Sequence, residues 1–173
     1  MSKPTTLAAQ LEAVGVKPAE IKYVAVSHTH PDHIGNVALF PQAMLLVQKA
    51  EYEWPSPFGP RFKPEHPVTK LEGDHDVFGD GSVTMVNLPG HTPGHHGLLV
   101  RLASGPVLLS GDTYHFAEQV ANRGVPPFNT DRADSLASMD RFDRLGRNLH
   151  ARIIIQHEPA DVAKLPAFPA SAR

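Results

Sequence analysis

The segment that most constrains this chain is residues 27–33, which read Ser-His-Thr-His-Pro-Asp-His. It follows a short apolar run, residues 21–26, that predicts a buried strand ending in a loop. Such a loop can direct His28 and His30 to one centre while Asp32 and His33 turn to another. Divalent metal ions accept nitrogen and oxygen ligands of this kind. We therefore predict two neighbouring metal ions; the alternative is a histidine-rich surface loop.

Three later residues extend this predicted site. His91 lies in a glycine-flanked turn that suits rigid presentation of one imidazole, and we expect it to be the third ligand of the first metal. Asp112 follows an apolar strand, where a carboxylate can bridge two cations with its two oxygens. His157 ends another apolar run. Taken singly, Asp112 is more typical of a turn and His157 of a structural histidine. His95 and His96 are expected to be structural.

Composition narrows the chemistry further. The 173 residues include no cysteine, so imidazole and carboxylate groups must hold any transition metal. The formal net charge is −2 and no basic stripe is present, which argues against a nucleic acid partner. No apolar run is long enough to cross a bilayer, so no membrane association is expected. The first four residues lack the apolar region of a secretory signal, and cytoplasmic localisation is the expectation.

Hydrophobic periodicity predicts alternating strands and helices. A helix should run from a cap at Thr5 or Thr6 through Val14, and a longer helix should begin at Asp131. Strands are expected at residues 21–26, 43–47, 83–88, 97–102, 107–110 and 152–156. The proline-rich residues 54–67 should form a loop that serves as a lid or as one wall of a pocket. This order of elements predicts a layered α/β or α+β domain.

The motif at residues 27–33, followed in order by His91, Asp112 and His157, resembles the metallo-β-lactamase superfamily. The Gly90 turn and the closing Gln156-His157-Glu158-Pro159 look most like its N-acyl homoserine lactonase branch. The resemblance implies an α/β fold of the αββα sandwich type. It also implies two divalent metal ions, with Zn²⁺ the first choice and Fe, Mn or Co as alternatives. Their ligands would be His28, His30 and His91 for the first metal, Asp32, His33 and His157 for the second, and Asp112 between them.

The implied reaction is hydrolysis of a small-molecule lactone, such as an N-acyl homoserine lactone, or of a related ester. A metal pair would acidify a water molecule and polarise the ester carbonyl, and Asp32 would take part in proton handling. Alternatives on the same ligands are a glyoxalase II-like thioester hydrolase, a phosphotriesterase and a β-lactamase. An alternative of another class is an inactive metal-binding or interaction protein.

The chain departs from this branch at two places. Such lactonases often carry a tyrosine three residues after the bridging aspartate, where this chain has His115, with Tyr114 one position earlier. Either is a candidate to contact substrate. The resemblance also begins near Thr5, so residues 1–173 are expected to form a single metallo-hydrolase domain that lacks much of its first sheet at the N-terminus. We therefore expect a homo-oligomer or an element-exchanged dimer rather than a self-sufficient monomer.

Overall fold

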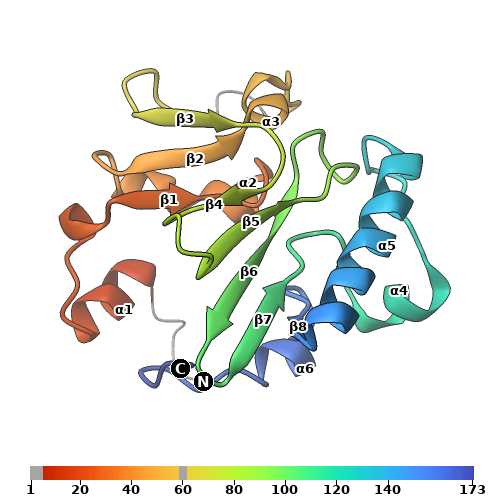
Figure 1. The fold of residues 1–173 in the computed structure, drawn as a ribbon. Coiled ribbons are helices and arrows are strands. Elements are labelled where there is room, and N and C mark those ends of the chain that lie inside the picture. Colours follow the sequence, from red (N-terminus) through yellow and green to blue (C-terminus); the bar gives the residue numbers. More distant parts are fainter. Residues whose placement is uncertain (1–5, 59–61) are drawn as a thin grey trace.

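The computed structural model describes residues 6–58 and 62–173. Two sheets face each other, and helices cover their outer sides (Figure 1). The first sheet has the order β1-β2-β3, all parallel, with strands Tyr23–Ala25, Met44–Gln48 and Val68–Leu71. The second has the order β4-β5-β6-β7-β8, with strands His75–Asp76, Val83–Asn87, His96–Leu102, Gly105–Leu109 and Arg152–Ile154. It is antiparallel except for the parallel pair β7 and β8.

The helices complete an αββα sandwich, which confirms the predicted fold class. The longest is α5, Arg132–Leu149, which lies along the outer face of the second sheet (Figure 1). The shorter helices are α1 (Leu7–Ala13), α2 (Pro31–Ile34), α3 (Lys49–Glu53), α4 (Ala117–Asn122) and α6 (Pro159–Val162), with 3-10 turns η1 (Pro18–Glu20) and η2 (Val37–Leu39).

Alternating side chains on the strands build three apolar layers, because successive residues of a strand point to opposite faces. On β2, Leu45 and Val47 pack toward Val26 and Val37, while Leu46 packs toward Met85 of the facing sheet. Residues of the second sheet, of the segments that follow its strands and of α5 form the third layer: Val86, Leu88, Leu99, Leu108, Tyr114, Met139, Phe142 and Ile155. The sandwich thus has a core between its sheets and one under the helices on each side.

The two main predicted helices begin where expected. The Thr6 side chain accepts a hydrogen bond from Ala9 N–H at 3.3 Å and caps α1, and Asp131 accepts one from Asp134 N–H at 2.8 Å and caps α5. The prediction of a buried strand at residues 21–26 was wrong in extent and burial. Only Tyr23–Ala25 is a strand, and Tyr23 and Ala25 are exposed, because β1 pairs with β2 alone among the described residues.

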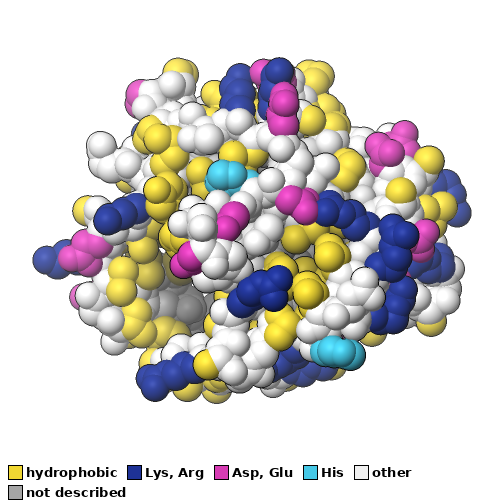
Figure 2. Space-filling model, viewed as in Figure 1, with side chains coloured by type: hydrophobic (Ala, Val, Ile, Leu, Met, Phe, Trp, Pro, Cys, Tyr) yellow, Lys and Arg dark blue, Asp and Glu magenta, His cyan; other side chains and the backbone are white. Residues whose placement is uncertain are grey.

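The surface carries mixed charge and some exposed apolar side chains. Figure 2 shows hydrophobic side chains over β1 and α1 on the left of this face, and Lys and Arg side chains over α5 on the right. In the described part of the chain, no helix combines the length and apolar character that crossing a membrane requires.

Candidate metal centre

The predicted ligands come from four segments, each of which follows a strand. His28 and His30 lie between β1 and α2, and α2 itself carries Asp32 and His33. The turn between β5 and β6 supplies His91, the segment after β7 supplies Asp112, and the segment after β8 supplies His157. Residues up to 129 positions apart in the sequence therefore meet at one end of the sandwich.

Two ligand clusters result. Atoms of His28, His30, His91 and Asp112 lie within 4.8 Å of one another, and so do atoms of Asp32, His33 and His157. We call these the first and second clusters. They match the division that the resemblance implied.

Asp112 lies between the two clusters and turns one oxygen to each. Its Oδ2 is 3.3 Å from His91 Nε2 and 3.7 Å from His28 Nε2. Its Oδ1 is 3.3 Å from Nε2 of both His33 and His157. This Oδ1 is buried and has no hydrogen-bond partner among the described residues. Such a buried polar atom normally requires a partner, and a cation would provide one.

The imidazoles of the first cluster are arranged as metal ligands are. The His28, His30 and His91 nitrogens are 3.0 to 3.2 Å apart in all three pairs. In a tetrahedron with bonds of about 2.0 Å, ligand atoms lie about 3.3 Å apart. Hydrogen bonds among three imidazole nitrogens that converge on one point cannot use all three lone pairs, whereas one metal ion can accept all of them. The residues present therefore fit a divalent ion.

The electrostatics agree with this fit. Burial lowers the pKa of His91 to about 4, and burial with neighbouring imidazoles holds the pKa of His28 far below its usual range. Neutral imidazoles keep the lone pair that a metal needs. Burial acts to raise the pKa of Asp112, but the nearby imidazoles of His115 and His33 outweigh it, so the pKa is lowered and the carboxylate stays ionised.

The structure separates the two substrate-contact candidates. Tyr114 is fully buried in the layer under α5, and its hydroxyl lies 3.1 Å from both carboxylate oxygens of Asp143 and 2.9 Å from Arg123. His115 instead lines the pocket above the clusters, with Nε2 3.2 Å from Asp112 Oδ2. Of the two residues, only His115 is placed where a substrate could reach it.

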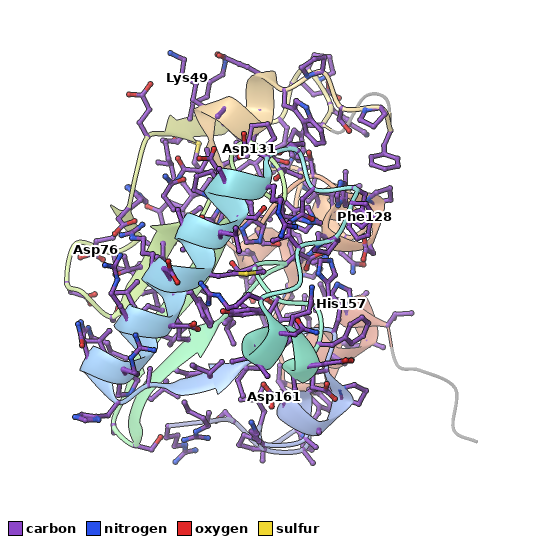
Figure 3. All side chains as sticks on the ribbon, turned by 90° about the vertical axis from the view of Figure 1, so that its right-hand side faces the viewer. Lys49, Asp76, Phe128, Asp131, His157 and Asp161 are labelled. Atoms are coloured by element: carbon purple, nitrogen blue, oxygen red, sulfur yellow. The ribbon has the colours of Figure 1, made fainter. Side chains whose placement is uncertain are left out.

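The pocket has a volume of about 480 Å³. Candidate ligands, including His30, Asp32 and His157, form its floor, and its walls are largely aromatic or proline side chains: Trp54, Pro57, Phe58 and Phe128. In Figure 3, the labelled Phe128 and His157 lie on the same edge of the molecule, beside α5. The described part of the 54–67 loop thus forms one wall, as predicted; residues 59–61 lie outside the described residues.

The sequence did not reveal the side chains that hold the candidate ligands in place. Asn129 Oδ1 accepts from His91 Nδ1 at 3.0 Å, and its amide donates to Ser135 of α5. The fully buried His95 donates from Nδ1 to Leu88 O and accepts the Asp112 N–H at Nε2, 2.7 Å away. Partners of this kind orient metal ligands. The expectation that His95 is structural agrees with its position, and nothing in the local sequence identifies Asn129.

The sequence profile of the metallo-beta-lactamase superfamily matches residues 1–157. The chain belongs to this superfamily. An N-acyl homoserine lactonase AttM of Azorhizobium caulinodans is 34% identical over 166 residues, which cover 87% of this chain and 63% of that protein. One from Rhizobium radiobacter is 34% identical and covers 92% and 67%. The chain therefore spans about two thirds of the length of these relatives.

Solved structures of N-acyl homoserine lactonases superpose on this chain. The lactonase AiiA of B. thuringiensis, in a variant with N-decanoyl-L-homoserine bound at the active site, superposes with a TM-score of 0.83 at 26% identity. The match covers 98% of this chain and 69% of that one. An N-acyl homoserine lactone hydrolase with the product N-hexanoyl-L-homoserine at its catalytic metal centre gives the same TM-score, identity and coverage.

Proposed function

We propose that this chain is a binuclear metal-dependent hydrolase that opens the ring ester of N-acyl homoserine lactones. The observation that carries the proposal is the position of Asp112, whose two oxygens face two separate ligand clusters at the floor of one pocket. Relatives named as N-acyl homoserine lactonases support the choice of substrate.

The first cluster would hold one divalent ion, the second another, and Asp112 would contact both. Bound at this site, two divalent ions supply Lewis acidity that lowers the pKa of water and polarises an ester carbonyl. Zn²⁺ is the first choice because it favours imidazole and carboxylate ligands in near-tetrahedral sets. Hydrolysis adds water across the acyl–oxygen bond, so one lactone gives one carboxylic acid and one hydroxyl group.

The chain's own residues would bind and orient the substrate. The aromatic wall of Trp54, Phe58 and Phe128 suits an apolar acyl chain, because burial of apolar surface favours binding. His115 faces the same space and can donate a hydrogen bond to a substrate oxygen. Asp32 also lines the pocket; its Oδ2 is 3.5 Å from His33 Nε2, where it can accept a proton during the reaction.

A substrate panel on metal-analysed protein tests this function. We expect ring opening of N-acyl homoserine lactones, followed by proton release and by mass spectrometry of the acid. A chelator should abolish turnover and added Zn²⁺ should restore it. Thioester hydrolysis without lactone activity would assign the glyoxalase II-like alternative instead. Full metal content with no turnover on lactones, thioesters, phosphotriesters or β-lactams would assign the inactive class.

A further inference from the structure

A buried carboxylate links two loops that carry histidines of the first cluster. Glu51, on α3, is completely buried. Its Oε1 accepts hydrogen bonds from the Thr29 N–H at 2.8 Å and the Thr29 hydroxyl at 2.6 Å. Its Oε2 accepts from the Gly94 N–H at 3.0 Å. Because burying a carboxylate is costly, these three bonds must offset its lost hydration.

The hydrogen-bond donors to Glu51 belong to the two loops that carry the histidines of the first cluster. Thr29 lies between the ligands His28 and His30. Gly94 lies three residues after His91, in the same turn. One carboxylate therefore holds together two histidine loops that are more than 60 residues apart in the sequence.

Gly94 shows how closely α3 approaches this turn. A Cβ atom built on Gly94 would lie 2.4 Å from the Glu51 backbone nitrogen and 2.5 Å from the Glu51 Cβ. Real side chains do not occupy such space, so only glycine permits the approach. Glycine at residue 94 therefore allows α3 to come close enough for the Gly94 N–H to donate to Glu51.

We propose that Glu51 is a positioning residue for the first metal: it sets the separation of the His28–His30 loop from the His91 turn. The inference rests on the proposed metal site but not on the substrate. The hydrogen bonds to Glu51 come from Thr29, between His28 and His30, and from Gly94 of the His91 turn, so its loss should weaken the first metal more than the second. Removing partners of metal ligands typically lowers metal affinity by about 10- to 100-fold.

Glu51→Gln tests this with little change in volume, because the amide turns a donor toward Thr29 or Gly94, both of which already donate. We expect chelator competition to show one of two metal equivalents bound about 10- to 100-fold more weakly. The Co²⁺ absorption spectrum of the substituted protein should change in parallel. Glu53→Gln is the matched control. Glu53 lies on the same helix, is half-exposed and pairs with Lys70, so the variant should bind both metal ions as tightly as the parent protein does.

Two variants at Thr29 keep the test decisive if Glu51→Gln folds poorly. Thr29→Val removes only the hydroxyl bond and should weaken the same equivalent by a smaller factor, whereas Thr29→Ser should restore it. Unchanged affinity for both metals in Glu51→Gln and Thr29→Val, with or without lost stability, would overturn the proposal and leave the hydrolase function standing. Parent protein that binds metal but opens no lactone would reject that function and leave this inference standing.

Discussion

Each oxygen of Asp112 faces a different cluster of candidate ligands, which makes its substitution distinguishable from that of any histidine. Asp112→Ala should cost both metal equivalents, whereas His28→Ala should cost only the one held by the first cluster. Loss of about 4 kcal/mol of transition-state stabilisation corresponds to a fall in turnover of about a thousandfold. Elemental analysis and lactone turnover of the two purified variants check this prediction.

His150→Asn provides the control. His150 ends α5 with a positive φ of 51°, a conformation that asparagine tolerates, and it lies outside both clusters. The variant should keep both metals and full turnover. An Asp112→Ala protein with two metals and unchanged turnover would disprove the bridging role.

Single residues also show what sequence can predict of a site. The ligand candidates were recognisable because four of them occur within six residues and the others stand beside strand ends. Glu51 and Asn129 were not, because their meaning depends on contacts with Gly94 and His91 that only the folded chain creates. Tyr114 and His115 were equivalent in the sequence. Burial under α5 separates them.

Among the elements, those with strong periodicity and a cap were predicted best. The helix from Asp131 has both, and α5 begins at the next residue. The strands β3 and β4 and the helices α2, α3, α4 and α6 were missed; the helices have at most six residues, too few to show a helical repeat. For β1, the apolar sequence indicated burial on both faces, but the exposure of a strand depends on its neighbours in the sheet, which periodicity does not reveal.

The attachment of α5 to the second sheet gives a prediction for pH. Arg141 of α5 donates to both oxygens of Asp74, at 2.9 and 2.6 Å, and to Asn87 O at the end of β5. Burial acts to raise the pKa of Asp74, but the Arg141 hydrogen bonds outweigh it and the pKa is lowered. A lowered pKa stabilises the fold above the unfolded-state value of about 4, and this stability is lost as pH falls through the folded-state pKa.

Asp74→Asn should therefore reduce the free energy of unfolding at pH 7 by about 0.5 to 1 kcal/mol, since the pair is partly exposed. The difference from the parent should shrink toward pH 3. Urea unfolding at both pH values, with chelator present to exclude metal release, measures it. As a control, Glu12→Gln on the exposed side of α1 should leave the free energy of unfolding unchanged at both pH values. A difference that grows as pH falls would contradict this account of the ion pair.

At the scale of the whole molecule, the face that carries β1 is the one most suited to association. Tyr23 of β1 and Phe78 of the turn before β5 are 46% and 59% exposed, and their rings meet edge to face at 6.2 Å. Hydrophobic side chains lie over β1 and α1 on this face (Figure 2). Among the described residues β1 pairs on one side only, so its other edge presents backbone groups able to pair with another strand. Exposed apolar patches beside an open edge favour contact with a second molecule.

We therefore predict that the chain self-associates through this face. Sedimentation velocity over a range of concentrations should show a species larger than the monomer, and Tyr23→Ser combined with Phe78→Ser should shift it to the monomer with metal content unchanged. The control is Phe168→Ser, since Phe168 is also half-exposed but lies in the C-terminal segment. Because each removed ring takes apolar area from the contact, both changes together should act more strongly than either alone. If the parent protein sediments as a monomer at every concentration, the β1 edge and the Tyr23–Phe78 pair do not form a contact between two chains, and the prediction is wrong.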